Sequence, residues 1–195
     1  MLDFVKPKDN ESEFLTAAKE LNLKLCFVYN DRKDFSNLKL ETPIAGIFDS
    51  MPKVREISNF DFVLFDCSKN PRMFAESKIQ GIMINCELSE KKDSLVKINS
   101  GIDDVIAVIM KKNKKVYGIN LSNLFSERIP INVLLRRISQ NIRLCRKHGV
   151  PFIPLTLVDE PIALKNPEDI KSFLKLFKVD PSDIKTAMSF FDGII

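Results

Sequence analysis

Residues 101–122 read GIDDVIAVIMKKNKKVYGINLS, and residues 134–151 read LLRRISQNIRLCRKHGVP. In both stretches, apolar residues first recur at helical spacing and then lead into a short strand-like run. The pattern predicts a helix over 102–113 followed by a strand over 116–121, and a helix over 132–147 followed by a strand over 151–157. Because each helix leads from one strand into the next, the strands are expected to pair in parallel.

The same alternation extends through the whole chain of 195 residues. Strands are predicted over 2–5, 24–29, 43–48, 61–65, 81–85, 116–121 and 151–157, and helices over 11–21, 52–59, 71–79, 102–113, 132–147, 169–177 and 182–191. Most of the strands are continuous apolar runs, which indicates burial on both faces of a parallel sheet. The spacing fits a doubly wound open sheet as well as a (β/α) barrel with several trimmed helices.

Length and composition predict one compact domain over 1–195, because a chain of this size buries about 70% of its unfolded surface in one core. No apolar run approaches the ~20 residues that cross a bilayer, and no charged-then-apolar leader opens the sequence, so we expect a soluble, unsecreted protein. The cysteines form no CxxC pair and lie in apolar segments, which predicts buried thiols and a cytoplasmic protein. They are Cys26, Cys67, Cys86 and Cys145.

The glycine content argues against a nucleotide-binding form of the open sheet. Such folds need a glycine-rich first turn that brings backbone N–H groups close to phosphate. The chain has 6 glycines, and none of them precedes Gly46. A bound nucleotide cofactor is therefore not expected.

Positive charge is concentrated in the middle of the sequence. Residues 101–150 contain 10 Lys and Arg against 3 Asp and Glu, whereas residues 1–100 contain 15 against 16 and residues 151–195 contain 5 against 7. A local excess of this kind steers polyanions toward a surface, so nucleic acid is the first candidate partner. The candidate RNA-binding residues are Lys111, Lys112, Lys114, Lys115, Arg128, Arg136, Arg137, Arg143, Arg146 and Lys147.

Local roles compete with RNA contact for the lysines. Ser100 and Asp103 have the spacing of a capping box, and Asp103 and Asp104 lie at the positive end of the dipole of helix 102–113. The lysines at the other end of that helix complement its negative pole without any ligand. A solvated helix surface is the alternative for the whole basic segment.

The helix predicted over 132–147 has two distinct sides. Its core-facing stripe consists of Leu134, Leu135, Ile138, Ile142 and Cys145. Its opposite side carries Arg136, Gln140, Arg143 and Lys147. Side chains of this kind hold phosphates by position and shape and do not read bases.

Polar residues follow several predicted strands, at the end of a barrel where chemistry is usually found. They are Asn30, Asp31, Asp49, Asp66, Asn85, Asn120 and Thr156. A free-standing phosphoesterase that holds Mg²⁺ or Mn²⁺ on Asp49 and Asp66 is the competing hypothesis. However, such centres usually combine imidazole with carboxylate, and His148 is the sole histidine. Capping of strand-to-helix turns explains both aspartates without a metal, so we predict neither a catalytic residue nor a metal site.

Three segments together resemble the ribonuclease P protein component 3 family. They are GIDDVIAVIMKKNKKVYGINLSNLFS at 101–126, NVLLRRISQNIRLCRKHGVPF at 132–152 and NPEDIKSFLKLFKVDPSDIKTAMSFF at 166–191. The shared features are a strand that ends in Asn120-Leu121-Ser122, a helix with Asn141-x-Arg143-Leu144-Cys145, and Pro167-x-Asp169 before two closing helices. The resemblance is close over 101–191 and extends to the earlier repeats only as a pattern.

This resemblance implies a compact, TIM-barrel-like (β/α) barrel with some trimmed helices, related in shape to metal-dependent phosphoesterases. It further implies a non-catalytic protein subunit of ribonuclease P, the ribonucleoprotein whose RNA, with bound Mg²⁺, removes the 5′ leader from precursor tRNA. The implied partners are the catalytic RNA, ribonuclease P protein component 2, the other protein subunits and, indirectly, precursor tRNA. No cofactor is expected on the protein itself, which is not expected to be an enzyme alone.

The chain departs from the family at two places. Asp104 stands where the family tends to have histidine after Gly-Ile-Asp, and Leu155-Thr156-Leu157-Val158 replaces a Ser-Ser-Ala-like turn. Family contacts at these positions are therefore not carried over. A barrel-shaped protein-binding module, whose basic surface is only solvated, is the third hypothesis, and it predicts no salt-sensitive retention of RNA.

Overall fold

The computed structural model describes residues 1–30, 42–94 and 98–192, and these residues form a parallel sheet of seven strands. The strands are β1 (Leu2–Val5), β2 (Lys24–Tyr29), β3 (Ile44–Phe48), β4 (Phe62–Asp66), β5 (Ile82–Ile84), β6 (Val116–Asn120) and β7 (Phe152–Leu155). Each corresponds to one predicted strand, shifted by at most two residues at an end. The continuous apolar runs were therefore correctly assigned to buried parallel strands.

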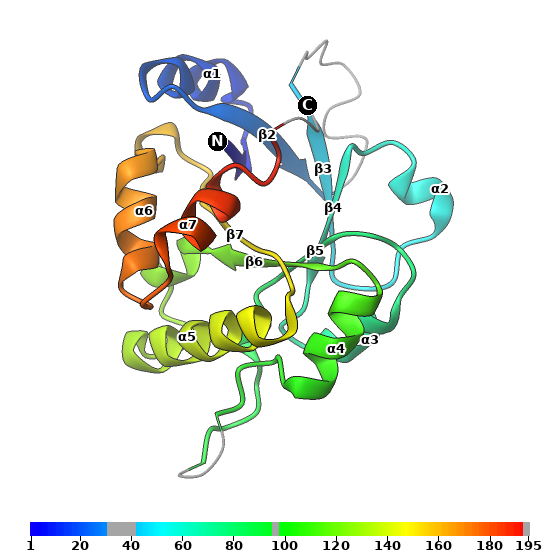
Figure 1. The fold of residues 1–195 in the computed structure, drawn as a ribbon. Coiled ribbons are helices and arrows are strands. Elements are labelled where there is room, and N and C mark those ends of the chain that lie inside the picture. Colours follow the sequence, from blue (N-terminus) through cyan, green and yellow to red (C-terminus); the bar gives the residue numbers. More distant parts are fainter. Residues whose placement is uncertain (31–41, 95–97, 193–195) are drawn as a thin grey trace.

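The strands follow one another in space in the order in which they occur in the sequence, from β1 to β7. Every neighbouring pair is parallel. A doubly wound sheet would reverse its strand order at a switch point, so the open-sheet alternative is wrong. The molecule is a nearly closed, TIM-barrel-like α/β barrel with its helices around the outside of the strands (Figure 1).

The ring closes where the chain after β7 meets β1. The backbone N–H of Leu157 donates to the Phe4 carbonyl over 2.8 Å, and the N–H of Lys6 donates to the Val158 carbonyl over 2.8 Å. Beside these bonds, one Asp3 oxygen accepts from the Thr156 backbone N–H over 2.9 Å and the other from the Thr156 hydroxyl over 2.8 Å. A buried carboxylate thus joins the first and last strands.

The inside of the barrel is filled by apolar side chains that alternate along the strands. Phe191, from the segment after the last helix, packs at 5.4 Å from the Phe4 ring and 5.1 Å from the Phe62 ring. Gly118 on β6 is required by this crowding, because a Cβ there would lie 2.7 Å from the side chains of Ile82 and Ile84. The interior is therefore a packed core and not a channel.

The outer layer contains helices of very unequal length. They are α1 (Glu11–Glu20), α2 (Val54–Ile57), α3 (Pro71–Glu76), α4 (Asp104–Lys112), α5 (Ile131–His148), α6 (Pro167–Lys175) and α7 (Pro181–Met188). With 4 residues, α2 is reduced to about one turn, and α3 has 6. This confirms the expectation of a barrel with trimmed helices.

The cap of α4 differs from the predicted one. Asp103 is the N-cap residue, and its carboxylate accepts from the Ile106 backbone N–H over 2.9 Å. The Ser100 hydroxyl instead donates to the Ile102 carbonyl over 3.1 Å. The predicted capping box was wrong because the helix begins two residues later than its apolar pattern, which starts at Ile102. Short 3₁₀ turns, η2 (Cys86–Leu88), η3 (Leu121–Phe125) and η4 (Pro161–Ala163), were also not predicted.

All four cysteines are free and buried, as expected. Burial raises the pKa of the Cys145 thiol to about 12, which leaves it protonated and unreactive at neutral pH. In the described parts of the chain, no helix is both long and apolar enough to cross a membrane.

We call the contact between β1 and the end of β7 the closing seam. Asp3 makes the stability of this seam depend on pH. Burial raises the pKa of its carboxyl from 3.8 to about 6, although three hydrogen bonds to the carboxylate oppose the rise. The folded state therefore holds the proton more tightly than the unfolded state does. The stability that this provides is complete below pH 3.8 and is lost as the pH rises through about 6.

We predict that Asp3→Asn gains stability relative to the parent protein as the pH rises. The amide oxygen keeps an acceptor at the seam but carries no charge, so the difference in free energy of unfolding should shift by about 2.5 kcal/mol between pH 4 and 7. Urea denaturation over this range measures it. Asp192→Asn, at an exposed aspartate, is the matched control, and parallel curves for Asp3→Asn and the parent would contradict the prediction.

Candidate nucleic-acid interface

The predicted basic surface is built around α5. This helix has 18 residues, so it is about 27 Å long. Arg128 lies just before its start and Gly149, with a left-handed φ of 66°, ends it. Four of the five stripe residues are buried as predicted, since Leu134, Ile138, Ile142 and Cys145 are each at most 2% exposed, whereas Leu135 is only partly buried. Arg136, Arg143, Arg146 and Lys147 lie on the exposed side of α5, and Arg137 is buried.

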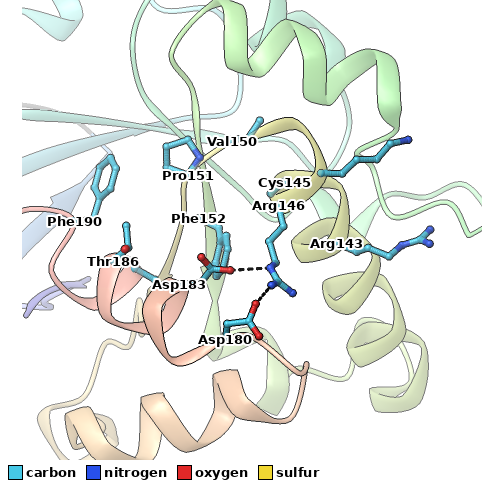
Figure 2. A pocket seen from close by; sticks show the side chains of 13 residues that line it. Arg143, Cys145, Arg146, Val150, Pro151, Phe152, Asp180, Asp183, Thr186 and Phe190 are labelled. Atoms are coloured by element: carbon cyan, nitrogen blue, oxygen red, sulfur yellow. Dashed lines mark hydrogen bonds and ion pairs between the residues drawn. The ribbon is translucent and has the colours of Figure 1, made fainter.

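Near the C-terminal end of α5, the cations hold carboxylates of the protein itself. Figure 2 shows Arg146 reaching from α5 to Asp180 and Asp183 beside α7, with 2.8 Å between Arg146 and Asp183. Lys147 lies 2.6 Å from Asp104, and His148 contacts the same oxygen over 2.8 Å. Hydrogen bonds from Lys147 and His148 lower the pKa of Asp104 to about 2. These pairs join α5 to α4 and α7.

Two arginines earlier in α5 share a single carboxylate, that of Asp93. The exposed Arg136 lies 2.6 Å from it, and the buried Arg137 lies 3.0 Å from it. Burial alone would raise the pKa of Asp93, but hydrogen bonds from Arg137, from the Asn99 N–H and from Arg136 hold it below its usual value. The guanidinium of Arg137 also donates to the carbonyls of Glu87, Ser89 and Lys91 over 2.7 to 2.9 Å.

Arg137 therefore has a structural role. It fixes the segment after β5, which projects beyond the barrel between α4 and α5 (Figure 1). Its side chain is 5% exposed and already meets four acceptor groups. It is not available to RNA in this arrangement, although its sequence position made it a candidate.

Lys115 is also buried inside the protein. It is 0% exposed, and its ammonium donates to the Ser77 hydroxyl over 2.7 Å, contacts the Ile79 carbonyl and lies over the Phe65 ring. Burial lowers the pKa of this lysine from 10.5 to about 8. No local pattern distinguishes Lys115 from its exposed neighbours, because its burial depends on Ser77, Ile79 and Phe65, which are distant in the sequence.

Four exposed lysines form a cluster where α3, α4 and α5 end. They are Lys78, Lys111, Lys112 and Lys114. The ends of α3 and α4 are held together by the Asn113 amide, which donates to the Ala75 carbonyl, and by Lys115 beneath them. Lys111 reaches the Gly149 carbonyl at the end of α5 over 2.7 Å. We call this set the lysine cluster.

The lysine cluster differs from the cations of α5 in having no carboxylate partner. Within the described residues, no ion pair involves any of its four members. The nearby Glu76 is paired with Arg72 at 2.7 Å. Lys78 was not among the predicted residues, since it precedes the basic segment 101–150 by 23 positions, and only the packing of α3 on α4 brings it there.

Among the described residues, Arg143 is the cation of α5 that contacts a neutral side chain and no carboxylate. Its guanidinium donates to the Gln140 side chain over 2.8 Å. It stands at the edge of a groove of about 740 Å³ between α5 and α7, whose apolar lining includes Pro151, Phe152 and Phe190 (Figure 2). Arg128 is exposed as well. Of the predicted RNA-binding residues, Arg128, Arg143 and the members Lys111, Lys112 and Lys114 of the lysine cluster thus have no carboxylate partner among the described residues.

The polar residues at the strand ends bind one another. One Asp66 oxygen accepts from the Ser68 N–H over 3.0 Å and the other from the Asn85 amide over 2.8 Å. The Asn85 oxygen in turn accepts from the amides of Asn120 and Asn123. Asn123 also donates to the buried Glu87 over 3.0 Å. We call Asp66, Asn85, Asn120, Asn123 and Glu87 the strand-end network.

This network gives the metal hypothesis no support. Among the described residues, no group of three or more His, Cys, Asp or Glu side chains is placed to hold a metal ion. The prediction that Asp49 and Asp66 cap helices was wrong, because Lys53 precedes α2 and Asn70 precedes α3. Asp66 instead stabilises a turn by accepting from the Ser68 N–H. Thr156 bonds Asp3 at the seam, and Asp31 lies outside the described residues. Burial raises the pKa of Glu87, which also accepts from the Tyr117 hydroxyl.

Comparison with known proteins identifies the fold. No family model and no curated protein matches the sequence. A chain in the cryo-EM structure of an archaeal ribonuclease P with mature tRNA superposes with a TM-score of 0.77 and 21% sequence identity, over 97% of this chain and 87% of that chain. At this identity the likeness shows the fold alone. It confirms the TIM-barrel-like fold that the sequence resemblance implied.

We predict that Arg137→Met lowers the free energy of unfolding by about 3 to 5 kcal/mol, because Asp93 and three carbonyls lose a buried partner. Arg136→Met removes an exposed arginine from the same aspartate and should cost at most about 1 kcal/mol. Urea denaturation of both variants measures the difference. Equal losses would show that the buried hydrogen bonds of Arg137 do not anchor the projecting segment.

Proposed function

We propose that this protein is a non-catalytic subunit of ribonuclease P that supports the catalytic RNA during removal of the 5′ leader from precursor tRNA. The observation that carries the proposal is the fold shared over nearly the whole chain with a component of the archaeal ribonuclease P–tRNA complex. A lysine cluster without carboxylate partners is the second support. The strand-end network, whose polar groups hydrogen-bond one another, is the third.

The physical role is to reduce repulsion between phosphates. A folded catalytic RNA brings its backbone close together around the Mg²⁺ ions that act in the reaction, and lysines that neutralise phosphates lower the cost of that compaction. Under this proposal the Mg²⁺ belongs to the RNA, and the protein supplies charge and shape. The contacts are to phosphates, so they carry no sequence preference.

The RNA-contacting surface is proposed to consist of the lysine cluster together with Arg143 and Arg128. Arg136, Arg146 and Lys147 are exposed but paired, and they join this surface only where a phosphate replaces their carboxylate. Exposed ion pairs contribute about 0 to 1 kcal/mol, so such an exchange is not costly. Arg137 and Lys115 remain internal.

The proposed partners follow from this role. They are the catalytic RNA, ribonuclease P protein component 2, the other protein subunits and, through the assembled particle, precursor tRNA. The reaction would take place in the cytoplasm. The groove between α5 and α7 has apolar floor residues and charged edges, a combination found at protein interfaces.

Reconstitution tests the role directly. Catalytic RNA and the companion proteins are assembled with and without this chain, and precursor tRNA cleavage is measured at limiting Mg²⁺. The proposal requires that the chain lower the Mg²⁺ concentration needed for cleavage. Phosphodiester cleavage by the chain alone, without RNA, would instead establish the phosphoesterase hypothesis.

We predict that the triple variant Lys78→Gln, Lys112→Gln and Lys114→Gln binds RNA more weakly and with a lower salt dependence. Each lost phosphate contact should reduce the slope of log K against log salt by about 0.7 to 0.9, and three contacts by about 2 to 3. Lys19→Gln, Lys24→Gln and Lys175→Gln, at exposed lysines elsewhere, form a control with the same change in net charge. If the two triple variants lose the same slope, the lysine cluster is not the interface.

A further inference from the structure

An exposed aromatic ring, that of Phe125, lies at the carboxyl end of the barrel strands, opposite the lysine cluster. Phe125 is the last residue of η3, which follows β6, and its side chain is 74% exposed. It differs from Phe4, Phe14, Phe27, Phe65 and Phe74, which are 0% exposed. Phe125 is the aromatic member of the exposed large hydrophobic residues among the described residues, so its ring face is open to a ligand.

The turn that carries Phe125 is held rigidly by the strand-end network. The Asn120 side chain accepts from the Ser122 backbone N–H over 3.0 Å and from the Ser122 hydroxyl over 2.8 Å. Asn123 donates to Asn85 and Glu87, both buried, over 3.0 Å each. Leu121 is buried below them. The ring therefore projects from a fixed backbone and not from a loose loop.

One cation lies over this ring, and a second is close to it in the chain. The Lys165 ammonium lies 5.4 Å from the centre of the Phe125 ring, which orients one face of it. Arg128 follows three positions later in the chain and is exposed. A planar apolar surface is thus combined with the positive charges of Lys165 and Arg128.

Unpaired RNA bases are the ligand that this combination fits. Proteins bind single-stranded nucleic acid by stacking bases on aromatic side chains while cations contact the backbone. Ile162, three residues before Lys165 in the chain, is 95% exposed, and a protein partner would be expected to cover it as well. The exposed Glu127 and Glu160 lie in the same segments, so stacking, rather than net charge, would supply the affinity here.

We propose that Phe125 is a stacking platform for an unpaired RNA base at the carboxyl end of the barrel, with Lys165 and Arg128 positioned for the adjoining phosphates. The inference rests on the proposed function, which makes RNA the partner. It adds a second site, distinct from the lysine cluster, that recognises single strands. The strand-end network then has a purpose, which is to fix the orientation of this ring.

Phe125→Trp provides the test, because the chain contains no tryptophan and the introduced indole is the sole such reporter. Full-length protein is titrated with a single-stranded RNA of mixed sequence and with a blunt duplex of the same sequence. Stacking predicts quenching of the indole by the single strand and little change with the duplex. Equal responses to both RNAs would overturn the proposal.

Phe125→Leu separates stacking from general apolar contact. It keeps an apolar side chain but removes the ring, and it should weaken single-strand binding at least about fivefold, with the salt slope unchanged. Ile162→Ala should leave single-strand binding unaltered. If leucine binds as well as phenylalanine, or if Ile162→Ala causes the same loss, the surface is an apolar docking site and the inference is wrong.

The two proposals fail in different ways. Loss of the Phe125 effect alone, with cleavage and the salt slope still dependent on the lysine cluster, would remove the stacking site and leave the ribonuclease P role in place. A chain that binds neither RNA and does not promote cleavage would remove both.

Discussion

Closure of the strand ring between β1 and the end of β7 is the constraint on which the rest of the structure depends. A sheet of seven strands has two open edges unless its first strand meets its last. Here two backbone hydrogen bonds join these edges, and the Asp3 carboxylate adds two hydrogen bonds to Thr156. The closed ring gathers the carboxyl ends of all strands at one mouth. It also places α3, α4 and α5 side by side around the outside, so both candidate RNA-binding sites follow from it.

The basic residues of this protein have two roles, one in holding the fold together and one on its surface. Most cations of α5 are held by Asp93, Asp104, Asp180 and Asp183, and these pairs fasten a projecting segment and two helices to α5. Only cations without such a partner present uncompensated charge to a polyanion. The excess of positive charge along the sequence therefore overstates the field at the surface of α5. The lysine cluster, where three helices end, is where that excess persists.

At the mouth of the barrel, polar side chains bind one another. In barrel enzymes, the strand ends usually carry groups that act on substrate. Here, Asp66, Asn85, Asn120, Asn123 and Glu87 satisfy one another through hydrogen bonds. Such a network, fully paired, rigidifies the backbone around it. What it fixes is the turn that ends in the exposed Phe125.

The sequence by itself determined the class of fold and its elements, because hydrophobic periodicity is a local property: all seven strands, and α5 with its buried stripe, lie where the pattern placed them. Its resemblance to a family also indicated a barrel where spacing left an open sheet equally possible. Tertiary structure alone decided the strand order, the cap at Asp103 and the fate of each cation. Lys115 and Arg137 became internal, and Lys78 joined the lysine cluster, because burial and pairing depend on residues distant in the chain that only the closed ring brings into contact.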